Sequence, residues 1–244
     1  MVIDFHTHSG VNFDKSTFAE LQEKMQQNGI ERAVIFPSTQ KAYQKLMQKN
    51  SETLKNAGKF FIPFLRFNPK TIKKDEFEEL QKGFYGFKLH PRGENFDPLD
   101  KSLEGVFEAM EKTGKPIIIH SRKENNINTD PDRIIELAKL YPKINFVFAH
   151  FANDSDVFFS KINELENAYV DTSVVSSPFI IERRVKEITS KKIVFGSDYP
   201  FSDQEIELLK IKKAKISETE KGDILQGNAK KLLNLCRKYE NSIQ

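Results

Sequence analysis

Histidine is the residue type in this sequence best suited to bind a metal ion, and all five histidines lie within or next to short apolar runs. They are His6 and His8, which form a His-x-His pair, and His90, His120 and His150. Neutral imidazole nitrogens bind zinc and similar divalent ions. Because alternate residues of a strand face the same side, His6 and His8 can bind one cation together. The pattern therefore predicts a divalent metal site.

A catalytic metal takes about three or four protein ligands and keeps a position for water or substrate. We expect His6, His8, His120 and Asp198 to supply these ligands, because each lies in or at the end of an apolar run. Asp198 would also lie within reach of a metal-bound water, whose lowered pKa would let the carboxylate accept its proton. This aspartate is thus predicted to act both as a ligand and in catalysis.

Eight apolar runs bounded by turn signals predict the strands that must position these residues. The runs are Val2–Phe5, Arg32–Phe36, Phe60–Phe67, Phe84–Leu89, Lys115–Ile119, Ile144–Ala149, Ala168–Asp171 and Lys192–Phe195. Continuous rather than alternating apolar residues are typical of strands covered on both faces, as in a parallel sheet. Parallel barrels carry their reactive groups at the carboxyl ends of the strands. The sequence therefore predicts an α/β fold, a (β/α)8 TIM barrel with its metal site at the C-terminal ends of the strands.

Helical patterns separate the predicted strands. Examples are Phe18–Met25 after a Ser16 cap, Leu103–Met110 before Gly114, and Ile134–Ala138 behind Asp130 and Pro131. We expect Asn228 to cap a final helix. Pro63 lies inside the third strand run, and we expect it among the first residues of that strand because proline lacks a ladder donor. The length of 244 residues suits one barrel, so residues 1–244 are predicted to form a single domain.

A polar segment, 121–130, directly follows His120. As a connection between a strand and a helix it would overhang the metal site and act as a lid, or it would be a disordered surface loop. Arg122 in this segment, and Arg92 after the fourth strand, could also face the pocket, but the favoured interpretation is that both are solvated loop charges.

The bulk composition excludes several classes of protein. Charged residues make up 30% of the chain, but the net charge is only +3, so nucleic acid is not an expected partner. The beginning of the chain has no basic segment followed by an apolar one, and no stretch suits a membrane span. The single cysteine, Cys236, cannot form an intrachain disulfide. We therefore expect a cytoplasmic protein without membrane contact.

Several motifs together resemble the amidohydrolase superfamily, specifically its amidohydrolase-2 branch. They are Asp4-Phe5-His6-Thr7-His8, Gly86-Phe87-Lys88-Leu89-His90-Pro91, Ile119-His120, Ala149-His150, Gly196-Ser197-Asp198-Tyr199-Pro200 and the segment 224–233. The resemblance implies a (β/α)8 barrel that holds one or two divalent metals, usually zinc. It also implies that His6, His8, His120 and Asp198 are ligands, and that His150 is an acid/base group or a second-metal ligand.

Lys88 determines how many metals the resemblance implies. In two-metal members of the superfamily a carboxylated lysine bridges the metals, whereas in one-metal members of this branch the group there more often meets substrate. We expect one metal, with Zn²⁺ as the first choice, although a binuclear site with carboxylated Lys88 and His150 as further ligands is possible. In the one-metal case Lys88 and Arg66 would attract an anionic substrate group. His90 would either contact substrate or bond to the loop backbone.

The predicted activity is a metal-dependent hydrolase that uses a metal-activated water on a small carboxylated or cyclic substrate, with Asp198 and His150 in catalysis. The alternative is a zinc-dependent non-oxidative decarboxylase or hydratase of an unsaturated or aromatic acid. A deoxyribonuclease of the TatD type is less favoured, because that family places a glutamate near Lys88. An inactive barrel acting as a binding protein is the least favoured. The expected partner is a small molecule, and a homo-oligomer is possible but has no mark in the sequence.

Overall fold

The computed structural model describes residues 1–9 and 17–234. Its strands are β1 (Ile3–Ser9), β2 (Arg32–Pro37), β3 (Phe61–Arg66), β4 (Gly86–Leu89), β5 (Ile117–Ile119), β6 (Phe146–Phe148), β7 (Ala168–Asp171) and β8 (Ile193–Val194). Its α-helices are α1 (Phe18–Asn28), α2 (Tyr43–Lys55), α3 (Lys74–Leu80), α4 (Glu104–Thr113), α5 (Pro131–Leu140), α6 (Asp156–Lys161), α7 (Pro178–Ile188), α8 (Gln204–Lys213), α9 (Glu218–Gly222) and α10 (Asn228–Leu232). Cys236 lies outside the described residues.

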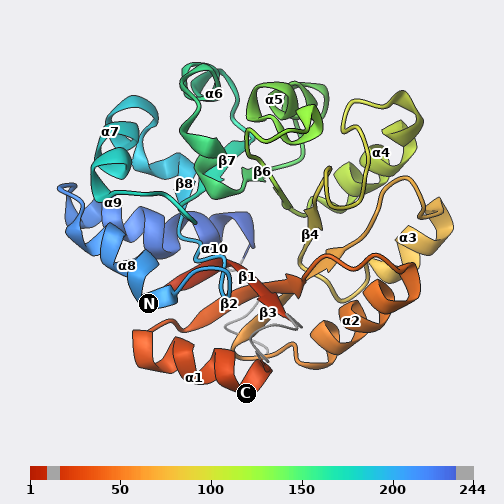
Figure 1. The fold of residues 1–244 in the computed structure, drawn as a ribbon, viewed down its shortest axis with the longest axis horizontal. Coiled ribbons are helices and arrows are strands. Elements are labelled where there is room, and N and C mark those ends of the chain that lie inside the picture. The colour runs from red at the N-terminus through yellow and green to blue at the C-terminus, as the bar shows by residue number, and fades with distance from the viewer. Residues whose placement is uncertain (10–16, 235–244) are drawn as a thin grey trace.

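The eight strands form one parallel sheet in the order of the sequence, from β1 to β8, and helices surround it (Figure 1). The sheet curls round so that β1 lies beside the segment that follows β8. Backbone bonds of 2.8 Å join Phe5 N to Phe195 O, and Asp198 N to His6 O. The predicted (β/α)8 barrel is therefore confirmed.

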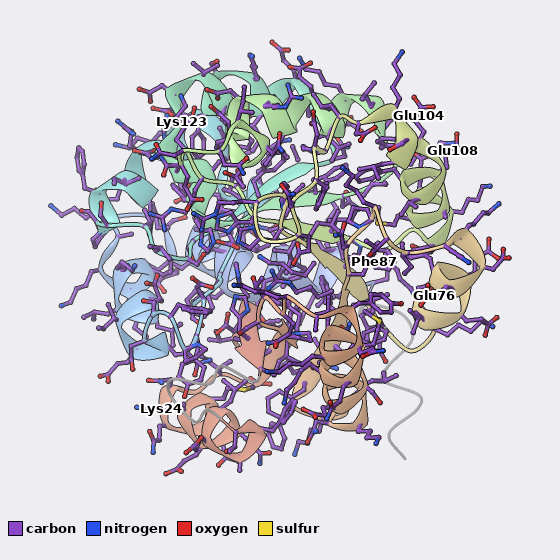
Figure 2. The ribbon with its side chains drawn as sticks, turned by 45° about the vertical axis from the view of Figure 1, so that its right-hand side comes forward. Lys24, Glu76, Phe87, Glu104, Glu108 and Lys123 are labelled. Carbon is purple, nitrogen blue, oxygen red and sulfur yellow. The ribbon has the colours of Figure 1, made fainter. Side chains whose placement is uncertain are left out.

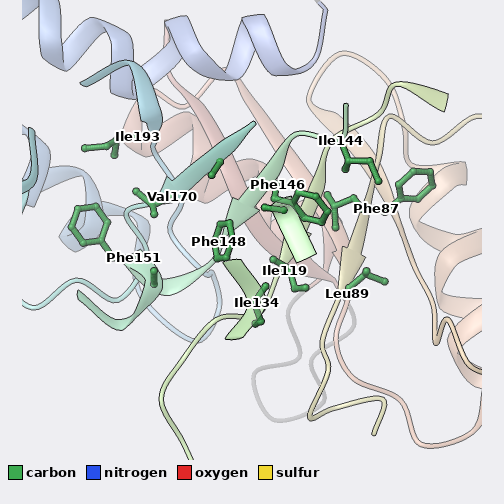
Figure 3. Packing of buried hydrophobic residues seen from close by; sticks show 14 of the residues in the cluster. Phe87, Leu89, Ile119, Ile134, Ile144, Phe146, Phe148, Phe151, Val170 and Ile193 are labelled. Atoms are coloured by element: carbon green, nitrogen blue, oxygen red, sulfur yellow. The ribbon is translucent and has the colours of Figure 1, made fainter. Parts of the chain in front are cut away.

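Alternation along the strands divides the apolar residues into two layers. On β5, Ile118 packs inside the barrel, whereas Ile117 and Ile119 pack between the barrel and the helices. Figure 3 shows this outer layer, in which Ile119 lies near Ile134 of α5. Both layers exclude water, which explains the continuous apolar character of the strands.

The outer surfaces of the helices carry the charged residues. Figure 2 shows Glu104 and Glu108 of α4 pointing away from the barrel. In the described residues no helix combines the length and the apolar character needed to cross a membrane.

The helix signals in the sequence were accurate at two helices and displaced at a third. Gly114 ends α4 in a left-handed conformation with φ of 66°, and Asp130 caps α5, which begins at Pro131. Helix α1 begins after Thr17, whose hydroxyl accepts a hydrogen bond from Glu20 N. The cap is therefore Thr17, and the predicted Ser16 lies outside the described residues.

Pro63 is the third residue of β3 and lies in its interior. Its carbonyl accepts a hydrogen bond of 2.9 Å from Tyr85 N, just before β4 begins at Gly86. The N–H and C=O of one residue in a parallel strand face the same neighbour. The proline nitrogen therefore faces the residues before β4, which are not yet paired with β3. Its missing N–H removes no hydrogen bond between the two strands.

Asn228 does not cap a helix, contrary to the prediction. It is the first residue of α10 and is buried. Its amide nitrogen donates to Ser190 O at 2.8 Å and to Ile193 O at 2.7 Å. The side chain therefore ties the last described helix to the start of β8.

Candidate metal centre

His6 and His8 of β1 and Asp198 after β8 come together at the carboxyl end of the barrel. The Nε2 atom of His6 lies 3.2 Å from Asp198 Oδ1, and that of His8 lies 3.0 Å from the same oxygen. One potential ligand atom from each of these three buried residues lies within 4.8 Å of the other two. The structure thus brings three of the four predicted ligands into one cluster.

Gly196 permits this close approach. A Cβ atom at this position would stand 2.9 Å from the Cβ of His6 and 3.1 Å from the Cβ of Asp171. Ordinary contacts of this kind measure 3.4–4 Å. Glycine is therefore required for β1, β7 and the segment after β8 to pack at this distance.

His120 borders the same region but does not join the cluster in the described residues. Its Nδ1 atom lies 3.0 Å from His150 Nε2. Its Nε2 atom is buried without a hydrogen bond among the described residues, with Glu124 Oε1 at 3.7 Å. The predicted role of His120 as a ligand therefore stays a prediction.

His150 follows β6 and begins a left-handed turn, since residues 150–154 all have φ between 46° and 57°. Its Nδ1 atom lies 3.1 Å from Ser173 Oγ and 3.8 Å from Asp198 Oδ2. Burial lowers the pKa of His150 to about 3. A neutral imidazole therefore faces the cluster, where it can take part in proton transfer or bind a cation.

Burial also keeps the other histidines neutral. It is the main cause that lowers the pKa values of His6, His8, His90 and His120 below their usual range, with nearby positive charges adding to it. For His6 and His8 the strongest of these charges is Lys88. Neutral imidazoles are the form that binds a divalent ion.

Lys88 of β4 points its ammonium group at the cluster. The Nζ atom lies 3.3 Å from His6 Nε2 and 4.9 Å from the ring centre of Phe36. Burial, followed by the charge of Arg66, lowers the pKa of Lys88 to about 8. A lysine in this environment is a cation at neutral pH, and its carboxylation and its contact with substrate stay predictions.

Arg66 lies at the end of β3, and its guanidinium group is bound by the protein itself. It donates to Glu94 Oε1 from Nε and Nη2, to Pro37 O and to Thr39 Oγ1, over 2.6–3.1 Å. Glu94 also accepts a hydrogen bond from His90 N at 2.8 Å. Arg66 therefore holds the loop after β4 in place, and a contact with substrate stays a prediction.

His90 bonds to the loop backbone, which is one of the two roles considered for it, and its contact with substrate stays a prediction. Its Nδ1 atom accepts a hydrogen bond of 3.2 Å from Gly93 N. Its ring stacks on that of His120, with centroids 3.8 Å apart and an interplanar angle of 15°. It also lines the cavity beside the cluster of His6, His8 and Asp198.

This cavity has a volume of about 320 Å³. Its lining consists of His8, Thr39, Arg66, Lys88, His90, Arg92, His120, Arg122, Glu124, His150, Asp198 and Phe201. A larger hollow of about 910 Å³ lies at the opposite, amino ends of β2 and β3, and no histidine lines it. The candidate chemistry thus lies at the carboxyl end, as it does in other barrels of this kind.

Arg92 is solvated as expected, with 51% of its side chain exposed, whereas Arg122 is partly buried. Both also line the cavity. Glu124, from the same connection as Arg122, also reaches the cavity and lies 2.9 Å from Arg92 Nε. The polar segment after β5 therefore overhangs the candidate metal site, and its action as a lid stays a prediction.

Asp171 is a functional candidate that the sequence motifs do not single out. It ends β7, is fully buried, and its Oδ2 atom lies 2.7 Å from His6 Nδ1. A signal is present in the sequence, because Asp171 closes a predicted strand just as Asp198 follows another. A search for metal ligands in the sequence does not identify Asp171, because this aspartate contacts His6 Nδ1 and is not itself a member of the cluster.

The donor set of the cluster fits a divalent cation. Two neutral imidazole nitrogens and one carboxylate oxygen are ligands that zinc and manganese both accept. The hydrogen bond of His6 to a buried carboxylate is the usual support for a metal-binding histidine.

An eight-stranded parallel barrel with a cluster of histidines and aspartate at the carboxyl ends of its strands is the architecture of a metal-binding (β/α)8 enzyme. The Amidohydrolase family model matches residues 3–235. The chain therefore belongs to the amidohydrolase family. No curated protein sequence matches the chain.

Solved structures with similar folds include three decarboxylases. The 2,6-dihydroxybenzoate decarboxylase from Rhizobium is 15% identical, with a TM-score of 0.77 over 96% of this chain and 98% of that one. The dihydroxybenzoic acid decarboxylase from Polaromonas, solved with manganese, is 16% identical, with a TM-score of 0.78 over 100% and 99%. The 5-carboxyvanillate decarboxylase from Novosphingobium aromaticivorans, also with manganese, is 12% identical, with a TM-score of 0.78 over 96% of each chain. At these identities the likeness shows the shared fold.

Proposed function

We propose that this protein is a divalent-metal-dependent, non-oxidative decarboxylase of a small carboxylated aromatic or unsaturated acid. The observation that carries the proposal is the cavity of about 320 Å³, which places the candidate metal cluster beside Lys88, Arg92 and Arg122. An anionic substrate is attracted to such a site. The fold shared with three decarboxylases supports the same function. Decarboxylation, the alternative on sequence alone, thus takes the place of hydrolysis as the favoured reaction.

The chain's own cations would bind and orient the substrate. The Lys88 ammonium and the Arg122 guanidinium face the cavity and would bind carboxylate or phenolate oxygens. Phe201 at the mouth offers a ring face on which a flat substrate can stack. His6, His8 and Asp198 would hold the metal, which supplies positive charge for orienting the oxygens of the substrate.

The reaction needs a proton at the carbon that carries the carboxylate. Addition of that proton to the ring carbon precedes cleavage of the carbon–carbon bond, whose electron pair returns to the ring as CO₂ leaves. The net change is one carboxylate and one proton converted into one C–H bond and one CO₂. We assign Asp198 and His150, 3.8 Å apart, to relay this proton from solvent water to the ring carbon, because neither group holds a spare proton of its own.

Hydrolysis is the second candidate function. The observation that favours it is the position of Asp198 next to both histidines, where its carboxylate can accept a proton from water at the metal. We keep Zn²⁺ as the expected ion on the basis of the imidazole ligands, with Mn²⁺ as the alternative that two of the similar structures hold. In either case we propose a single domain that acts on a small molecule in the cytoplasm.

The test is an assay of CO₂ release from 2,6-dihydroxybenzoate and 5-carboxyvanillate, with Zn²⁺ or Mn²⁺ added. A parallel assay uses dihydrocoumarin and p-nitrophenyl acetate as hydrolase substrates. The variant D198N should lose about 10²–10⁴-fold in turnover, as expected for a group in proton transfer. The control D203N retains activity, because Asp203 caps α8 and Asn serves the same purpose. Ester or lactone hydrolysis that depends on Asp198, without CO₂ release, would overturn the decarboxylase assignment.

A further inference from the structure

Asp171 connects three parts of the candidate site through one buried carboxylate. Its Oδ2 atom lies 2.7 Å from Nδ1 of His6 on β1. Its Oδ1 atom accepts hydrogen bonds from His150 N at 3.0 Å, from Ser173 N at 3.0 Å and from Ser173 Oγ at 2.6 Å. The side chain is completely shielded from solvent, so these groups are its partners in the described residues.

The direction of each hydrogen bond in this network follows from its acceptor. A carboxylate only accepts, so His6 carries its proton on Nδ1 and leaves a lone pair on Nε2. This assignment agrees with Lys88 Nζ, a donor, at 3.3 Å from His6 Nε2. The His6 lone pair therefore points into the cluster with His8 and Asp198.

The second branch runs through Ser173. This serine has one hydroxyl proton and donates it to Asp171, so its oxygen must accept from His150 Nδ1, 3.1 Å away. Neutral His150 then has its lone pair on Nε2, which accepts from His120 Nδ1 at 3.0 Å. His120 in turn keeps a lone pair on its buried Nε2 atom, which makes no hydrogen bond among the described residues.

We propose that Asp171 is a positioning residue that, directly and through Ser173, sets the tautomers of His6, His150 and His120, so that His6 presents its Nε2 lone pair to a divalent cation in the cluster with His8 and Asp198. One buried carboxylate thereby prepares imidazoles on three different strand ends. The proposal concerns metal binding and is independent of the reaction that the site performs.

The variant D171N tests the direct branch with almost no change of shape. Three donors, from His150 N, Ser173 N and Ser173 Oγ, face Oδ1 and require an oxygen there. The asparagine nitrogen must then face His6 Nδ1 and donate to it, which moves the His6 proton to Nε2. Zinc affinity, measured by competition with a chromophoric chelator, should fall about 10–100-fold.

Nitrogen-15 NMR of the metal-free protein reads the tautomers themselves. In the wild type, His6, His120 and His150 should all be protonated at Nδ1, and in D171N His6 should change to Nε2–H. The variant S173A should release His150 and His120 from a single tautomer while His6 keeps Nδ1–H. The differing response of the two branches separates positioning from a general loss of packing.

The chain contains a matched control pair. Ser197 Oγ donates to the buried Asp4 at 2.6 Å, as Ser173 does to Asp171, but Asp4 bonds to the backbone N of His6 and not to its ring. The variants D4N and S197A should lower the melting temperature while keeping the three tautomers. Unchanged His6 tautomer and zinc affinity in D171N would refute the proposal. If D171N fails to fold, an unchanged His150 and His120 in S173A would refute it instead.

Discussion

Replacing Gly196 by alanine should damage the metal centre by a contact that the structure defines. The added Cβ would lie 2.9 Å from the Cβ of His6, about 0.5 Å short of an ordinary contact. Overpacking of this kind costs about 1–3 kcal/mol. For a chain of this length each kcal/mol lowers the melting temperature by roughly 2–4 °C. We therefore expect a fall of about 2–12 °C in the metal-free protein.

The same displacement should weaken metal binding, because metal sites tolerate only about 0.2 Å of error in ligand distances. We expect zinc affinity to fall at least about tenfold in the chelator competition assay. The matched control is G105A, since a Cβ at Gly105 in α4 meets nothing within 4 Å. Alanine there should stabilise the helix by about 0.5–1 kcal/mol and leave zinc binding unchanged. If G196A melts and binds zinc like the wild type, the close approach of His6 is not what requires glycine.

K88M should stabilise the metal-free fold at pH 7, because burial lowers the Lys88 pKa from 10.5 to about 8 and the charged form thus costs the folded state roughly 3 kcal/mol. This penalty is complete below about pH 8 and fades toward pH 10.5. In urea unfolding, K88M should therefore gain less free energy of unfolding over the wild type at pH 10 than at pH 7. An equal gain at both pH values would contradict the reasoning. Removing metal with a chelator should lower the melting temperature, since an ion at 100 times its Kd contributes about 2.7 kcal/mol, and added Zn²⁺ or Mn²⁺ should restore it. N228S should lose about 1–3 kcal/mol in urea unfolding without a change in zinc affinity, because serine can cap a helix but is too short to make the two buried amide bonds of Asn228. If N228S is as stable as the wild type, Asn228 stabilises the fold as a helix cap and not through its two buried amide bonds.

The sequence predicted the barrel and the central cluster because both depend on position along strands. The end of a parallel strand directs His6, His8 and Asp198 to one rim, and a pattern of apolar runs is enough to find those ends. The sequence did not predict that Arg66 would be bound by Glu94, because Glu94 lies in a loop whose path depends on tertiary packing. The same limit applies to Arg92 and Arg122, whose orientation toward the cavity follows from the shapes of two loops.

Hydrogen-bond networks were harder to predict from the sequence than strand positions. Asp171 and Ser173 are two residues apart in the sequence, but their partners His6 and His150 lie 165 and 23 residues from them. Nothing in a local pattern identifies such partners. Asn228 shows the same effect, since a residue with a strong local preference for capping instead serves two backbone carbonyls that lie 38 and 35 residues before it.

The closure of the barrel beside β1 has a consequence for folding during synthesis. His8 and Asp198 are 190 residues apart, and the bonds that close the sheet lie next to the same residues. During synthesis β1 therefore leaves the ribosome long before the segment that contains Asp198 has been made. His6 and His8 can meet Asp198 only after almost the whole barrel has been synthesised. A divalent ion held there would join the first and last strands of the fold. Metal capture by a nascent chain would accordingly report that the ring of strands has closed.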